Sequence, residues 1–168
     1  MKLKSSALPV VPSEPSEFLR DVVKRNREGE AVGTYAVCSA HPAVLDAAIQ
    51  EALTDGTVLH VESTSNQVNQ FGGYTGCTPA QFAEQIRRSA QEAGLPSTRV
   101  LLGADHLGPY CWRSEPAARA MANASELAAQ SVLAGYQKIH PDASMACLDD
   151  PASLSEEVVA GGAIRNMR

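Results

Sequence analysis

The chain has 168 residues and a formal net charge of −5, and its composition is 44% hydrophobic but only 5% aromatic. This length allows one domain with a hydrophobic core, and the lack of any long block of Lys or Arg argues against nucleic-acid binding. The N-terminal apolar run is shorter than a signal-peptide core of roughly 7–15 residues, and no run approaches the roughly 18 of a membrane span. We therefore expect a cytoplasmic protein that binds neither nucleic acid nor membranes.

The chain opens with a predicted lead-in, residues 1–15, and a short amphipathic helix whose apolar residues recur at helical spacing. The first β-loop-α unit follows. It has a predicted strand over residues 33–40 and a helix that opens at Pro42 and stops near Gly56.

The second unit has a predicted strand over residues 57–64 and a long polar loop. Its helix opens with Thr78, Pro79 and Gln81, which combine an N-cap, a proline at the first helical position and the glutamine of a capping box. This helix is expected to run to Gly94.

The third and fourth units repeat the pattern. Strands are predicted over residues 99–105 and 136–144, with one helix from about Glu115 to Gly135 and a last helix from Ser153. Four successive units of this kind predict an α/β fold with a parallel sheet, because each helix returns the chain for another parallel strand.

All four predicted strands end in polar or reactive side chains. A (β/α) barrel gathers every such end around one axis, whereas an open doubly wound sheet uses only those near its switch point, so we favour a (β/α)8 TIM barrel. A complete barrel needs about 250 residues. We therefore expect residues 16–160 to form the N-terminal half of a truncated barrel, and residues 161–168, which contain Gly161 and Gly162, to be an atypical, frayed tail.

An acid and an imidazole, Asp105 and His106, stand side by side at the end of the third strand. A histidine can bind a divalent metal while a neighbouring carboxylate moves a proton on a metal-held substrate. Both reach one site only where the strand bends, which Gly103 and Gly108 would allow. The alternative is a hydrogen-bonded loop histidine beside a turn-capping aspartate. Glu62 is either a second catalytic carboxylate or a half-buried acid.

The loop after the second strand is a candidate substrate-binding segment. Its amides suit sugar hydroxyls and its paired glycines let backbone N–H groups approach a phosphate, although an ordinary turn-rich loop is the alternative. The residues concerned are Asn66, Gln67, Asn69, Gln70, Gly72 and Gly73.

The fourth strand carries two further pairs of polar residues. His140 and Asp142 share a face if the strand is extended, so His140 is either a second metal ligand or a structural residue. Asp142 and Ser144 are candidate substrate-binding residues at the strand end.

Four stretches, CSAHP, VESTSNQVNQFGGYTG, GADHLGPYCW and KIHPDASMAC, in this order and spacing, resemble the Z-type, non-catalytic subunit family of class II D-tagatose-1,6-bisphosphate aldolase. The resemblance covers roughly residues 20–160. It implies a (β/α)8 barrel related to the zinc-dependent class II aldolases. It also implies that Asp105 matches their proton-transferring aspartate and His106 a metal-ligand histidine.

The resemblance implies an accessory subunit that supports the activity and stability of a separate catalytic aldolase subunit in tagatose and galactitol catabolism. The alternative it leaves open is a metal-dependent C4-epimerase or aldolase, which would use Asp105 and His106 on a phosphorylated ketohexose. Pro141 replaces an aliphatic residue that is usual in the family. The later strands, with the remaining metal-binding histidines, are also missing. Alone, this truncated chain is expected to be inactive, to hold zinc only in a completed site, and to expose a sheet edge that favours association.

Overall fold

The computed structural model describes residues 14–151 and 153–166, so nearly all of the predicted lead-in lies outside the described residues. At its centre is a parallel sheet of three strands, β1 (Leu59–Thr64), β2 (Val100–Leu107) and β3 (Lys138–Pro141), in the order β1-β2-β3. The predicted α/β class and parallel pairing are confirmed, and the sheet is open.

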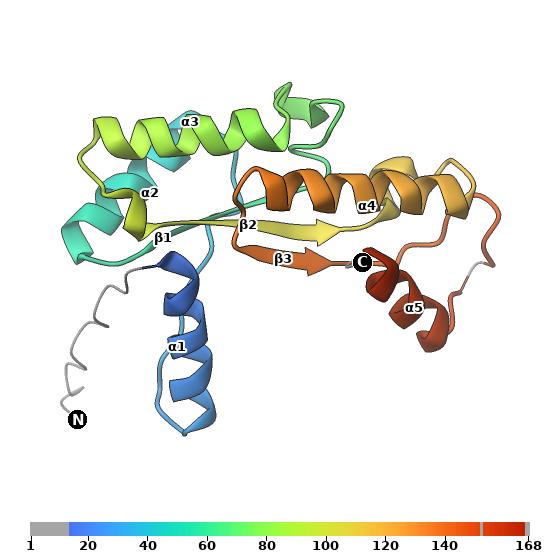
Figure 1. Ribbon diagram of the computed structural model, residues 1–168, viewed down its shortest axis with the longest axis horizontal. Helices are drawn as coiled ribbons and strands as arrows, with labels where there is room; N and C mark the ends of the chain where they lie inside the picture. Colours follow the sequence, from blue (N-terminus) through green and yellow to red (C-terminus); the bar gives the residue numbers. More distant parts are fainter. Residues whose placement is uncertain (1–13, 152, 167–168) are drawn as a thin grey trace.

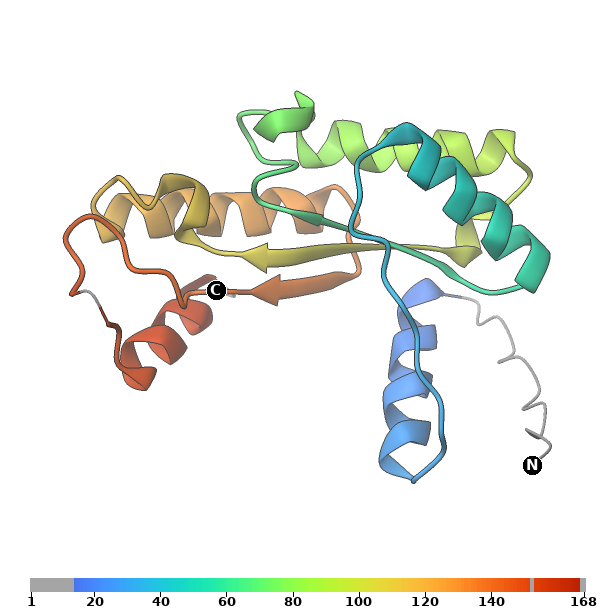
Figure 2. The same cartoon turned by 180° about the vertical axis from the view of Figure 1, so that it is seen from behind.

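Three helices lie on one face of the sheet, and two of them, α3 and α4, connect consecutive strands. Figure 1 shows α2 (Pro42–Asp55), α3 (Pro79–Glu92) and α4 (Ala117–Leu133) above the strands, while α1 (Pro15–Arg27) lies below them. Seen from behind, the same layering holds, and α5 (Glu156–Asn166) lies beyond the carboxyl end of β3 (Figure 2). Among the described helices, none is both long and apolar enough to cross a membrane.

The main hydrophobic core lies between the sheet and these three helices. Alternate strand residues such as Val61, Leu102 and Ala104 are almost fully buried against Phe82 and Leu127. This follows from the period of two in a strand, which places every second side chain on the helix-covered face. The opposite face has a smaller cluster under α1, formed by Phe18, Val22, Val58 and Leu101.

The start of α3 is the capping box that the sequence predicts. The Thr78 hydroxyl accepts a hydrogen bond from the Gln81 backbone N–H, and the Gln81 side chain accepts one from the Thr78 N–H at 2.9 Å. Two backbone donors that have no partner within the helix are satisfied in this way.

The strand predicted over residues 33–40 is wrong. Only Val37 forms a bridge, with Val61 of β1, through hydrogen bonds of 2.8 and 3.0 Å to the backbone of His60 and Glu62. In the described part of the chain this segment has β1 on one side and no strand on the other. Its apolar pattern therefore does not produce a continuous ladder.

Gly161 and Gly162 do not interrupt the last helix, which continues to Asn166. A Cβ on Gly162 would lie 2.7 Å from the Cβ of Ala143, so the missing side chain lets α5 approach the loop that follows β3. Residues 161–166 of the expected frayed tail are thus helical, and the close packing of Gly162 offsets the low helix propensity of glycine.

The ends of β2 and β3 meet at Gly108. The Asp142 backbone N–H donates to the Leu107 carbonyl at 2.9 Å, and a Cβ on Gly108 would lie 1.5 Å from the Asp142 carbonyl oxygen. No rotamer change relieves a clash with backbone, so only glycine fits here.

The substitution Gly108→Ala is therefore expected to separate the two strand ends and to lower the free energy of unfolding by about 3 kcal/mol or more. Urea denaturation followed by circular dichroism measures the loss. The matched control is Gly33→Ala, because a Cβ there meets nothing within 4 Å. Equal stability of the two variants would contradict this account of Gly108.

Candidate functional site

The sheet face opposite the crossover helices has a group of charged and imidazole side chains near the carboxyl ends of the strands. We call it the polar cluster. It consists of His60, Glu62, Asp105, His106, Lys138 and His140. Gly103 pairs with Glu62 on one side and Lys138 on the other, so all three strands contribute to the cluster in register.

Lys138 joins the two predicted catalytic carboxylates. Its Nζ lies 2.8 Å from Oε1 of Glu62 and 3.1 Å from Oδ1 of Asp105. This link spans β2, and it is possible because Gly103 has no side chain there: a Cβ would lie 2.7 Å from Cγ of Glu62. Burial alone would lower the pKa of Lys138, but the hydrogen bonds to both carboxylates outweigh it and raise the pKa above its ordinary value.

Glu62 is only 6% exposed, and the almost equally buried His60 lies beside it, with Nε2 2.9 Å from Oε1 of Glu62. Burial lowers the pKa of His60, and the neighbouring Glu62 opposes this shift only in part. The neutral imidazole is therefore the favoured form inside the cluster.

Asp105 receives two hydrogen bonds from β3, through His140 and Lys138, and its strand neighbour His106 lies farther away. Nδ1 of His140 lies 2.7 Å from its Oδ1, and Nε2 of His106 lies 3.4 Å from its Oδ2. Burial alone would raise the pKa of Asp105, but the hydrogen bonds from His140 and Lys138 outweigh it and hold the pKa below its ordinary value. Asp105 is therefore an ionised carboxylate, as a proton acceptor must be.

His106 reaches the same side of the sheet as its neighbour Asp105 through its own backbone. Successive strand residues point to opposite faces, but His106 has a φ of 51° and lies in the left-handed region. The change in strand direction that we expected at Gly103 or Gly108 therefore occurs in the backbone of His106. Nδ1 of His106 lies 3.1 Å from Oδ2 of Asp142.

A candidate metal centre follows from these contacts. Asp105, His106 and His140 offer ligand atoms that all lie within 4.8 Å of one another. In both imidazoles Nδ1 meets a carboxylate, which is the arrangement that orients zinc-binding histidines and leaves Nε2 for the metal. Imidazole nitrogens suit zinc, and the Asp105 carboxylate is placed either to join them as a ligand or to act as a proton acceptor beside the metal.

The sequence did not indicate Lys138 or His60 as site residues. The signal that could have found them is the period of two, because His60 precedes Glu62, and Lys138 precedes His140, by two positions on their strands. The prediction that His140 and Asp142 share a face uses the same period of two.

The amide-rich loop lies after β1, and most of its side-chain amides form hydrogen bonds with other groups of the protein. Oδ1 of Asn69 accepts hydrogen bonds from the N–H groups of Phe71 and Gly73, at 2.8 and 3.1 Å. Oε1 of Gln67 accepts the Thr64 N–H at 2.7 Å. These contacts fix the path of the loop.

The other candidate substrate-binding residues differ in their surroundings. Gln70 donates to the Asn123 carbonyl of α4 at 2.9 Å, Gly72 is buried, and the exposed Asn66 accepts a weak hydrogen bond from the Cys111 thiol. Oδ1 of Asp142 accepts the N–H and hydroxyl of Ser144, at 2.9 and 2.5 Å. Burial alone would raise the pKa of Asp142, but these hydrogen bonds outweigh it and lower the pKa.

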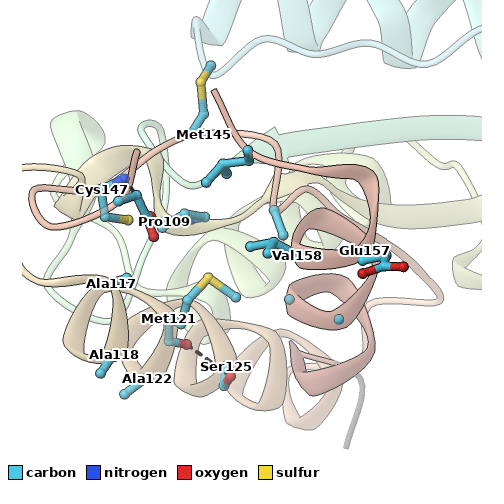
Figure 3. Close-up of a pocket in the computed structure, with 15 residues that line it drawn as sticks. Pro109, Ala117, Ala118, Met121, Ala122, Ser125, Met145, Cys147, Glu157 and Val158 are labelled. Atoms are coloured by element: carbon cyan, nitrogen blue, oxygen red, sulfur yellow. Dashed lines mark hydrogen bonds between the residues drawn. The ribbon is translucent and has the colours of Figure 1, made fainter. Parts of the chain in front are cut away.

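A separate cavity of about 630 Å³ lies between α4 and α5 (Figure 3). Its walls are mainly small and apolar, including Met121, Met145, Cys147 and Val158, and the members of the polar cluster do not line it. The short Ser125 side chain binds back to the Met121 carbonyl at 3.0 Å. The charged residues in its lining are Asp150 and Glu157, and neither belongs to the polar cluster.

Comparison with known proteins gives matches over most of the chain. Residues 19–167 match the model of the family described as D-tagatose-1,6-bisphosphate aldolase subunit GatZ/KbaZ-like. The relatives include the D-tagatose-1,6-bisphosphate aldolase subunits GatZ of Salmonella agona, 51% identical over 142 residues, and Klebsiella pneumoniae, 49% identical over 147 residues. These alignments cover 84% and 88% of this chain but only 34% and 35% of the relatives.

Among solved structures, a crystal structure of a probable tagatose 6 phosphate kinase from Sinorhizobium meliloti 1021 superposes with a TM-score of 0.75 at 41% sequence identity. The match covers 78% of this chain and 34% of that one, so the chain spans about a third of the length of the proteins it matches. The family match, which extends from α1 through α5, shows that the chain belongs to the GatZ/KbaZ-like family of D-tagatose-1,6-bisphosphate aldolase subunits.

Proposed function

We propose that this chain is part of an accessory, non-catalytic subunit that supports a class II tagatose-1,6-bisphosphate aldolase in cytoplasmic tagatose or galactitol catabolism. The observation that carries the proposal is the match of residues 19–167 to a family of aldolase subunits. The relatives are themselves named as subunits, which supports a separate catalytic aldolase subunit as the protein partner.

The proposed architecture is the first half of a (β/α)8 barrel. Two features support it: the strands follow one another across the sheet in chain order, and the two crossover helices, α3 and α4, lie on the same face as α2. A barrel needs both, because its helices form an outer ring around sequential strands. The polar cluster then faces the barrel axis, and the outer edge of β3 is the place where the sheet would continue.

A second function, a metal-dependent C4-epimerase or aldolase acting on a ketohexose phosphate, is favoured by the metal centre. His106 and His140 would hold a divalent metal, with zinc preferred, and the metal would polarise a substrate carbonyl. Ionised Asp105 would accept a proton, and Glu62 would hold Lys138 in place. The names of the relatives and of the solved structure share a tagatose phosphate, which supports a phosphorylated ketohexose as the ligand class.

Substrate contacts are proposed at the carboxyl ends of the strands. The exposed Asn66 and Ser144 follow the ends of β1 and β3, whereas the Gly73 N–H already donates to Asn69 and helps to hold the loop. Gln67, Asn69, Gln70 and Gly72 would act by keeping this loop in shape, and Asp142 by orienting His106.

The accessory function predicts direct association with the catalytic aldolase subunit. Co-expression of the chain with a class II tagatose-bisphosphate aldolase should lead to co-purification and raise the melting temperature of the aldolase by a few degrees, because a ligand that binds only the folded state stabilises it. Thermal denaturation of the aldolase with and without the chain measures this. The heat-denatured chain is the control, and a lack of association in a pull-down would refute the accessory function.

The catalytic alternative predicts that a full-length relative converts fructose 6-phosphate to tagatose 6-phosphate when supplied with Zn²⁺. The change that corresponds to Asp105→Ala should lower turnover by at least about a hundredfold, the usual contribution of a general base. The change that corresponds to Asp46→Ala, on the exposed face of α2, is the matched control. Unchanged turnover after the Asp105 substitution would exclude the assigned role.

A further inference from the structure

Lys138 is the charged group at the centre of the polar cluster. Its ammonium contacts Glu62 and Asp105 together, and its side chain is 29% exposed. The sequence and the comparisons assign it no part in the site. Its position raises the question of what a fixed positive charge does beside a candidate metal centre.

The two oxygens of the Asp105 carboxylate have different surroundings. Oδ1 is held by the Lys138 ammonium at 3.1 Å and by Nδ1 of His140 at 2.7 Å. Oδ2 has His106 at 3.4 Å as its neighbour. One oxygen is therefore fixed within the protein, and the other faces the imidazole that is the predicted metal ligand.

We propose that Lys138 is a positioning residue that keeps Asp105 out of the coordination sphere of a divalent cation held by His106 and His140. The inference rests on the metal centre of the proposed catalytic function. A cation that bound the Asp105 carboxylate would lie close to the ammonium, and the two positive charges would repel each other across a partly buried site. With Lys138 in place, the carboxylate remains available to move a proton.

Glu62 makes this charge stationary. An exposed lysine swings freely, but Lys138 is held from a second side by Glu62, which is almost fully buried and lies over Gly103. The ammonium therefore stays beside Asp105 instead of moving away when a cation arrives. The measurable consequence is that the effect of a Lys138 substitution on Zn²⁺ affinity should depend on whether Asp105 is present.

The test measures the affinity of the chain for Zn²⁺ by isothermal titration calorimetry, without turnover. Lys138→Met removes the charge and keeps most of the side-chain volume, so Asp105 should join the ligands and Zn²⁺ should bind about tenfold more tightly or better. Lys138→Arg keeps the charge and should retain the affinity of the unaltered chain. Lys138→Gln gives the same expectation as Lys138→Met and replaces it if the Met variant does not fold.

A double variant separates the role of Asp105 from a general charge effect. In an Asp105→Asn background, Lys138→Met should lose most of its gain in affinity. The absorption spectrum of bound Co²⁺ should change with Lys138→Met only when Asp105 is present, because an added oxygen ligand alters the coordination. A merely structural lysine would change neither quantity in this way.

Weaker or unchanged Zn²⁺ binding by the Met variant, an equal gain in the Asp105→Asn background, or no Zn²⁺ binding by any variant would each overturn the proposal. Association with the aldolase subunit requires no zinc in this chain. A chain that binds no Zn²⁺ would overturn the metal centre itself, whereas a chain that binds Zn²⁺ without the expected response to Lys138→Met would overturn only the role of Lys138.

Discussion

The organisation of the sheet depends on the need to compensate one buried carboxylate. Glu62 is removed almost completely from solvent, and an uncompensated charge in such a place is very costly. The compensating charge comes from Lys138, two strands away, and the pair meets only because the strand between them carries Gly103 at the crossing point. A pair of this kind gives little net stability, but it ties three strands to one register. That same register brings Asp105 and His140 together.

The sequence allows much of the fold to be predicted, because the responsible signals are local. Helix caps such as Thr78 and the apolar periodicity of α2, α3 and α4 need no knowledge of distant residues. The segment around Val37 shows the limit of this reasoning. Its apolar residues fit a strand, but a strand forms only where a neighbour supplies the ladder, and whether that neighbour exists is a property of the tertiary fold.

The candidate site was predictable where chemistry coincided with a strand end, as for Asp105 and His106. The sequence does not predict a role for Lys138, because a lysine on a strand is ordinarily a solvated surface residue. Only the pairing of β3 with β2 brings its ammonium into contact with two carboxylates. For the amides of the loop after β1, the sequence suggested more ligand-binding groups than the structure leaves available. Amides suit a sugar ligand, but the Asn69 side chain forms its hydrogen bonds with the backbone of the loop itself.

At His106, the backbone conformation and the side chain have opposite requirements for the residue type. Glycine would adopt a φ of 51° without the steric cost that a side chain with a Cβ incurs there. It would also delete the imidazole that meets Asp142 and Asp105. The substitution His106→Gly would therefore remove a steric cost and, with it, one imidazole of the candidate metal centre. The steric cost at His106 is what a functional role of this imidazole would have to offset.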